Sequence, residues 1–133
     1  MLEQTGEKSI VVALAGAPNV GKSTVFNLLT GLSQHVGNWP GKTVEQKTGA
    51  MHRGNLTINF VDLPGTYSLT ANSAEEQIAR DYLVKEKPDV VVAVLNAASL
   101  ERNLYLVAEL IATVSIQWSM SGTNTILGMA FSC

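Results

Sequence analysis

A short segment near the N-terminus has the residue types and spacing needed to bind a polyphosphate. Residues 16–23 read GAPNVGKS and match the pattern G-x-x-x-x-G-K-[ST]. Glycines let such a loop curl so that successive backbone N–H groups converge on phosphate oxygens. Lys22 can reach the β- and γ-phosphates, and the Ser23 hydroxyl can ligate Mg²⁺. A chance match is expected in only about 1% of chains of this length, so the segment predicts a P-loop.

A second motif follows later in the chain. Residues 62–65 read DLPG and match D-x-x-G, which in GTPases places an aspartate behind Mg²⁺ and a glycine N–H against the γ-phosphate. Alone, an aspartate after a strand is about as often a simple turn or helix cap. After a P-loop, Asp62 is instead expected to be the metal partner of Ser23. Thr43, between the motifs, can supply a second hydroxyl to Mg²⁺ when a γ-phosphate is present.

The elements that must position these motifs alternate between strands and helices. Residues 9–15 form a continuous apolar run ending at Gly16, which is typical of a strand buried on both faces of a parallel sheet. Residues 22–30 have apolar side chains at helical spacing, whereas residues 32–44 have no period and indicate a functional loop. The other predicted elements are an edge strand 45–51, a strand 56–63, a helix 74–84 capped by Ser73, a strand 90–95 and a helix 100–112.

Composition limits the class of protein. The 133 residues are 46% apolar and 15% charged, which suits one globular domain, and the net charge of −2 gives no basic face for nucleic acid. The single cysteine, Cys133, excludes an internal disulfide and favours a reduced cytosolic setting. Residues 1–8 are polar and unlike a secretory signal, and the apolar run 90–95 is too short to cross a bilayer. We therefore expect a soluble, cytoplasmic fragment.

The C-terminal region differs from the rest of the chain. No charged residue follows Glu109, and residues 113–133 have no clear helical or strand period. Two interpretations remain open. The first is a fifth strand at residues 113–118 followed by a disordered end, and the second is a non-native or truncated C-terminus.

Three segments carry residues that phosphate chemistry alone does not demand. Residues 36–45 read VGNWPGKTVE, residues 62–69 read DLPGTYSL and residues 100–106 read LERNLYL. Together they resemble the G domain of the ferrous iron transport protein B family, with the spacing retained from about Ile10 to Ile111. The resemblance implies a P-loop NTPase fold of the Ras-like G-domain type, α/β, with a mostly parallel sheet, one antiparallel edge strand and an incomplete C-terminal part.

The resemblance also implies a domain division and a function. Residues 1–8 would be a tail, residues 9–112 a partial G domain and residues 113–133 an atypical uncharged tail. The chain would bind and hydrolyse GTP at the cytoplasmic face of a bacterial inner membrane, as part of an Fe²⁺ transporter whose helical and transmembrane parts are absent here. Expected cofactors are GTP or GDP, Mg²⁺ and K⁺. Expected partners are the guanine nucleotide and the rest of the transporter, and self-association is left open.

The resemblance assigns roles to individual residues. Lys22, Thr43 and Gly65 would be catalytic, and Asn19 would help to coordinate K⁺, with the backbone near Gly37 and Trp39 completing that site. Mg²⁺ would be held by Ser23, Thr43 and Asp62. The full predicted nucleotide-binding set is Gly16, Ala17, Pro18, Asn19, Val20, Gly21, Lys22, Ser23, Thr24, Gly37, Asn38, Trp39, Gly41, Lys42, Thr43, Asp62, Leu63, Pro64 and Gly65.

Two departures from the expected pattern keep other functions open. Residues 112–133 contain no N-K-x-D motif for guanine, and Thr66 and Tyr67 stand where Ras-like GTPases have a glutamine that orients the attacking water. One alternative is therefore a phosphate- and Mg²⁺-binding fragment with little turnover. Another is a different K⁺-dependent GTPase, in ribosome assembly or tRNA modification, against which the NWPG segment and the charge argue.

Overall fold

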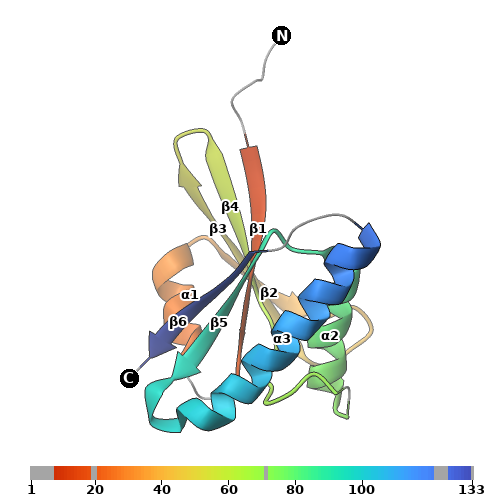
Figure 1. Ribbon diagram of the computed structural model, residues 1–133. Helices are drawn as coiled ribbons and strands as arrows, with labels where there is room; N and C mark the ends of the chain where they lie inside the picture. The colour runs from red at the N-terminus through yellow and green to blue at the C-terminus, as the bar shows by residue number, and fades with distance from the viewer. Residues whose placement is uncertain (1–7, 19–20, 71, 122–125, 133) are drawn as a thin grey trace.

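The computed structural model describes residues 8–18, 21–70, 72–121 and 126–132, and shows a sheet with helices on both faces (Figure 1). The strand order is β2-β3-β4-β1-β5-β6; α1 covers one face, and α2 and α3 cover the other. The elements in chain order are β1 (Lys8–Gly16), α1 (Lys22–Thr30), β2 (Gln34–Asn38), β3 (Glu45–Arg53), β4 (Leu56–Asp62), α2 (Ala74–Glu86), β5 (Val90–Asn96), the 3₁₀ turn η2 (Ala97–Ser99), α3 (Leu100–Ser121) and β6 (Ile126–Ser132).

Strand β1 is the centre of the fold, as its continuous apolar run predicts. It pairs in parallel with β4 on one side and β5 on the other. Ala13 and Ala15 face the core under α2 and α3, whereas Val12 and Leu14 pack with Phe26 of α1. Because the carboxyl ends of parallel strands meet at one edge of a sheet, the loop after Gly16 lies beside the end of β4.

The predicted mostly parallel α/β sheet is confirmed, but the predicted edge strand is not the edge. Strand β3 is antiparallel to β4, and residues 34–38, predicted as part of a loop, form β2 and pair antiparallel with β3 on its outer side. The side chains of β2 are mostly exposed, so this strand is held by backbone hydrogen bonds rather than by an apolar face. A sequence pattern based on hydrophobic alternation therefore misses it.

The C-terminal region forms more regular structure than its sequence predicts. Helix α3 continues to Ser121 instead of ending at residue 112, so the predicted strand at residues 113–118 is wrong. Residues 126–132 form β6, which pairs in parallel with β5 from Val90↔Ile126 to Asn96↔Ser132. The end of α3 was not predicted because, without charged residues, it lacks the polar face by which an amphipathic helix is recognised. Strand β6 is held by backbone pairing with β5, which needs no such face. The predicted division of the chain at residue 112 stays a prediction.

Within the part of the chain that the structure describes, no helix combines the length and apolarity needed to cross a lipid bilayer.

The approach of α1 to β3 gives a first prediction. A Cβ atom on Gly49 would lie 2.5 Å from Thr30 Cγ2 and 2.9 Å from the Ser33 carbonyl oxygen. The Thr30 hydroxyl donates to the Phe26 carbonyl oxygen at 2.9 Å, so the side chain cannot turn away freely. Gly49→Ala should lower the free energy of unfolding by about 1–3 kcal/mol. Urea denaturation followed by circular dichroism measures it. The control is Gly37→Ala, where no heavy atom lies within 4 Å, and equal stability of both variants would contradict the prediction.

Candidate phosphate-binding site

The P-loop segment joins the end of β1 to the start of α1. Gly21 precedes the helix with φ of 91°, a left-handed conformation that glycine adopts without steric cost. The first N–H groups of an α-helix have no partner within the helix, so the first turn, Lys22 to Thr24, presents donors and the positive end of the helix dipole to an anion. Asn19 and Val20, two of the predicted binding residues, lie outside the described residues.

The end of β4 places Asp62 against the first residue of α1. Leu14 pairs with Asp62 in the sheet, and the Leu63 N–H donates to the Leu14 carbonyl oxygen at 3.0 Å. The Lys22 ammonium donates to Asp62 Oδ1, and each of these side chains is only 10% exposed. Two charges buried to this extent require each other, because an unpaired buried charge costs several kcal/mol, by an order-of-magnitude estimate. The structure thus brings Lys22 and Asp62 together, and Ser23 follows Lys22 in the chain.

A pocket of about 660 Å³ opens above this pair. Its walls come from the P-loop, the loop after β4, the start of β3 and the start of α2. Ser23 is exposed at the pocket, and Lys22 forms part of its floor. The lining residues are Ala17, Pro18, Gly21, Lys22, Ser23, Val44, Glu45, Pro64, Gly65 and Glu75.

The D-x-x-G loop packs directly on the P-loop. A Cβ atom on Gly65 would lie 2.9 Å from Pro18 Cα, so only glycine allows this approach without a shift. The N–H of the next residue, Thr66, donates to the Gly16 carbonyl oxygen at 2.9 Å, and the Thr66 side chain is buried. Leu63, which is almost completely buried, fixes the start of the loop in the core. The two predicted phosphate-binding loops are therefore one packed unit.

Most of the predicted switch segment lies outside this pocket, although Val44 at its end is a lining residue. Thr43 is exposed and does not line the pocket, and Gly37, Asn38, Gly41 and Lys42 are exposed as well. The backbone of this segment closes on itself, since the Trp39 N–H donates to the Val44 carbonyl oxygen at 2.9 Å and the Lys42 N–H donates to the Trp39 carbonyl oxygen at 2.9 Å. The structure does not bring residues 37–43 to the phosphate pocket.

Trp39 anchors that segment to α2. Its side chain is 7% exposed and meets the ring of Tyr82 edge-on, with centroids 5.7 Å apart and planes at 76°. Burial, together with the negative charges of Glu86 and Asp89, raises the pKa of Tyr82 to about 12, so its phenol is neutral at physiological pH. Among the described residues, the indole N–H of Trp39 has no hydrogen-bond acceptor although it is buried.

Sequence reasoning missed several residues at the site. Glu45 and Glu75 line the pocket, and Arg102 and Glu109 of α3 contact the loop after Gly65. Glu75 follows the Ser73 cap in the first turn of α2, which is the signal that could have placed it there. Arg102 lies in the LERNLYL segment, but no local pattern predicts the contact of Arg102 or Glu109 with this loop, since these contacts join segments far apart in the sequence.

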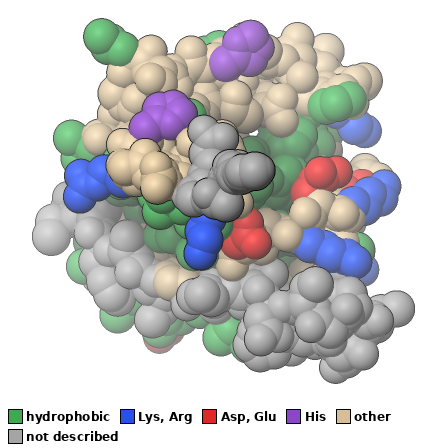
Figure 2. Space-filling model, turned by 90° about the horizontal axis from the view of Figure 1, so that it is seen from above, with side chains coloured by type: hydrophobic (Ala, Val, Ile, Leu, Met, Phe, Trp, Pro, Cys, Tyr) green, Lys and Arg blue, Asp and Glu red, His purple; other side chains and the backbone are tan. Residues whose placement is uncertain are grey.

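The oxygen atoms of the side chains near the pocket favour a hard cation if a metal binds. Within the described ranges, no three His, Cys, Asp or Glu side chains form a group that could hold a metal ion. The Ser23 hydroxyl and the Asp62 carboxylate offer oxygen ligands, which suit Mg²⁺ when waters and phosphate oxygens complete its shell. Figure 2 shows the molecule from above, where acidic side chains lie next to basic ones toward the right of the view. By type, the oxygen atoms of Ser23 and Asp62 fit Mg²⁺.

Comparison with known proteins adds to this geometry. The model of the family "Ferrous iron transport protein B" matches residues 10–120. The Fe(2+) transporter FeoB of Methanocaldococcus jannaschii is 58% identical over 103 residues, which are 77% of this chain and 15% of that protein. The chain thus spans only a small part of that relative.

Solved structures agree with the family model. The G domain of the T. maritima FeoB iron transporter matches with a TM-score of 0.78 and 39% identity, covering 93% of this chain and 87% of that one. The cytosolic domain of the same transporter, in a structure described as GDP form I, matches with a TM-score of 0.73 and 52% identity over 77% of this chain and 40% of that one.

The contact between the two loops gives a second prediction. Gly65→Ala should push the D-x-x-G loop away from Pro18 and lower the affinity for a nucleoside triphosphate about tenfold, which is about 1.4 kcal/mol. Isothermal titration calorimetry measures the affinity. Gly128→Ala is the control, because no heavy atom lies within 4 Å of a Cβ added there. If Gly65→Ala binds as tightly as Gly128→Ala, the close packing has no role in binding.

Proposed function

Because the chain belongs to the ferrous iron transport protein B family, we propose that it binds and hydrolyses GTP as the G domain of a ferrous iron transporter. The observation that carries the proposal is the paired Lys22 and Asp62 beside Ser23, below a pocket walled by two packed phosphate-binding loops. Phosphoryl transfer needs little more than positioning and charge stabilisation, which such a pocket can provide.

The preference for guanine rests on relatives. The cytosolic domain of the T. maritima protein is described in a GDP form and is 52% identical to this chain. Residues 112–133 contain no N-K-x-D sequence to accept hydrogen bonds from the guanine edge. The pocket geometry supports recognition of the phosphates, and the family supports recognition of the base.

Lys22 and Asp62 would exchange partners when a nucleotide enters. Lys22 would leave Asp62 and donate to the β- and γ-phosphates, whereas Asp62 and the Ser23 hydroxyl would hold Mg²⁺. The metal supplies positive charge that offsets the charge developing on the phosphate oxygens. The buried pair would then be replaced by two new pairs, so neither charge is left without a partner.

K⁺ dependence is also proposed from the family. The resemblance assigns Asn19 to the cation, and a monovalent cation between phosphates would stabilise developing charge as an arginine finger does. The chain would act at the cytoplasmic face of the membrane, joined to the parts of the transporter that it does not include. The proposed partners are accordingly the guanine nucleotide and the rest of the transporter.

One observation favours an alternative with little turnover. Thr43 is exposed and outside the pocket, and the Thr66 N–H is already bonded to the Gly16 carbonyl oxygen, so neither of these residues is placed to orient water. We therefore expect residues 39–44 to move before hydrolysis. A domain that binds phosphate and Mg²⁺ without this movement would be the phosphate-binding fragment. The family match argues against a GTPase of ribosome assembly or tRNA modification.

Phosphate release separates these functions. We expect release from GTP in K⁺ to exceed release from ATP in K⁺ and from GTP in Na⁺. Binding of GDP without K⁺-dependent release from GTP would support the binding fragment. Faster release from ATP would overturn the guanine assignment.

The Lys22 side chain gives a third prediction. Lys22→Ala should lower GDP affinity at least tenfold, by an order-of-magnitude estimate for a lost charge-assisted phosphate contact, while the chain stays folded. Calorimetry measures the affinity, and circular dichroism monitors the fold. The double variant Lys22→Ala/Asp62→Asn also removes the carboxylate that would lose its partner. Recovery of affinity in the double variant would show that the loss came from the unpaired charge rather than from a phosphate contact.

Movement of residues 39–44 gives a fourth prediction. The chain has two tryptophans, so Trp118→Phe leaves Trp39 as the sole indole emitter. Adding GMPPNP with Mg²⁺ should shift the Trp39 emission to longer wavelength, because we expect the movement that brings Thr43 into the pocket to draw Trp39 out of its buried contact with Tyr82. GDP should give a smaller shift. The Trp39→Phe variant, in which Trp118 is the remaining tryptophan, should not show this emission shift. An unchanged spectrum at saturating GMPPNP would contradict the proposed movement.

A further inference from the structure

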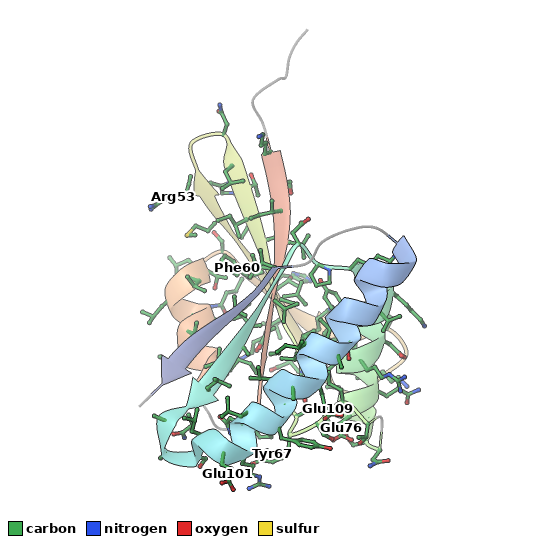
Figure 3. The ribbon with its side chains drawn as sticks, viewed as in Figure 1. Arg53, Phe60, Tyr67, Glu76, Glu101 and Glu109 are labelled. Atoms are coloured by element: carbon green, nitrogen blue, oxygen red, sulfur yellow. The ribbon has the colours of Figure 1, made fainter. Side chains whose placement is uncertain are left out.

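The loop that follows Gly65 is held from three sides. On the first side, Gly65 packs against Pro18, and the Thr66 N–H donates to the Gly16 carbonyl oxygen. On the other two sides, Tyr67 and Leu69 contact α3, and Ser68 and Asn72 contact α2, the helices that cover this face of the sheet (Figure 3). A loop with so many attachments has little conformational freedom left to lose when a ligand binds.

Helix α3 provides the longest-range attachments. The Arg102 guanidinium lies over the Tyr67 ring, 3.8 Å from its centroid. The Leu69 N–H donates to Glu109 Oε1 at 2.9 Å. Arg102 and Glu109 are about two helical turns apart, so they lie on one face of α3 and contact the loop at two points.

Helix α2 provides the attachment at the far end of the loop. Glu76 Oε2 accepts a 2.6 Å hydrogen bond from the Ser68 hydroxyl, and Glu76 Oε1 accepts one from the Asn72 N–H at 3.0 Å. The bond from Ser68 is the main reason that the pKa of the Glu76 carboxyl lies below its usual range. The start of the helix is fixed as well, because the Ser73 hydroxyl accepts from the Glu76 N–H.

The α3 attachments lie close to the P-loop. Tyr67 and Arg102 line a cavity of about 190 Å³ together with Ala17 and Pro18 of the P-loop. Helix α3 itself is tied to the end of β5, because buried Asn103 accepts a 2.7 Å hydrogen bond from the Asn96 N–H. Helix α3 is therefore fixed to the same sheet edge that carries the P-loop, and its contacts with the loop after Gly65 are made from that fixed position.

These attachments are polar or exposed, so core burial does not require them. Arg102 is exposed and Tyr67 is 39% exposed, whereas Leu69 alone reaches the core. Folding of the loop could rest on Leu63 and Leu69, which are buried on either side of Gly65. The arginine and the glutamate instead restrict the backbone between those two leucines, which includes the Gly65 N–H.

We propose that Arg102 and Glu109 are positioning residues, which act through Tyr67 and Leu69 to hold the Gly65 N–H at the place of the γ-phosphate of GTP. This inference rests on the proposed function, since it names residues that would make the site bind GTP differently from GDP. A donor fixed in advance strengthens binding and charge stabilisation, because no reorganisation is needed when the phosphate arrives.

Paired substitutions test the proposal. Arg102→Ala and Glu109→Ala should each lower kcat for GTP and the affinity for GMPPNP about tenfold, within the range expected from a small misplacement. GDP affinity should stay within about twofold, because GDP has no γ-phosphate for the Gly65 N–H to contact. Arg102→Lys and Glu109→Gln keep a cation over Tyr67 and an acceptor for Leu69, and should restore most of both losses.

Glu101→Ala is the matched control. Glu101 is an exposed neighbour of Arg102, and it makes no hydrogen bond or ion pair with the loop among the described residues. Amide hydrogen exchange of residues 65–69 provides a readout independent of catalysis, and should be faster in both alanine variants but not in Glu101→Ala. If exchange stays unchanged, core burial alone holds the loop and the proposal is overturned.

Two other outcomes are also decisive. An equal loss of GDP and GMPPNP affinity, with lower thermal stability, would assign a purely structural role and overturn the positioning role. If the unsubstituted chain binds neither nucleotide, the proposed function fails, whereas the exchange comparison still reports whether α3 holds the loop.

Discussion

The parallel pairing of β1 with β4 is the constraint on which the site depends. It places the carboxyl ends of both strands at one edge of the sheet, so Lys22 and Asp62 meet although they are far apart in the sequence. A slip of one residue would turn Asp62 to the opposite face of the sheet. The register is held firmly because β1 is packed on both faces, with Ala13 on one side and Leu14 on the other. Core packing thus sets the geometry of the charged groups.

The pairing of Lys22 with Asp62 has a consequence for binding. Both side chains are largely removed from water, so each charge needs a partner whether or not a ligand is present. A phosphate alone would satisfy Lys22 and leave Asp62 unpaired, and a metal alone would do the reverse. Under the proposed function, the low cost of replacing both partners together would make nucleotide and metal bind cooperatively.

Local sequence predicts the parts of the site that follow from backbone rules, but not those that follow from packing. The P-loop, the strand before it and the end of β4 at Asp62 were predictable because glycine spacing and apolar runs mark them. Strand β2 was not, because its exposed residues carry no alternation. The contact of Glu109 with Leu69 spans 40 residues and depends on how α3 crosses the sheet, which no local pattern specifies.

The two loops beside the pocket differ in how firmly they are attached. Residues 65–69 contact the P-loop and two helices, whereas residues 39–44 depend largely on one buried side chain, Trp39. Within the described residues, its indole N–H finds no acceptor, and such a buried donor costs about 1–3 kcal/mol. Release of Trp39 to water would recover that cost and offset part of the lost ring contact. The Trp39 segment is therefore suited to respond to the nucleotide, and the loop after Gly65 to remain as the fixed frame against which that response occurs.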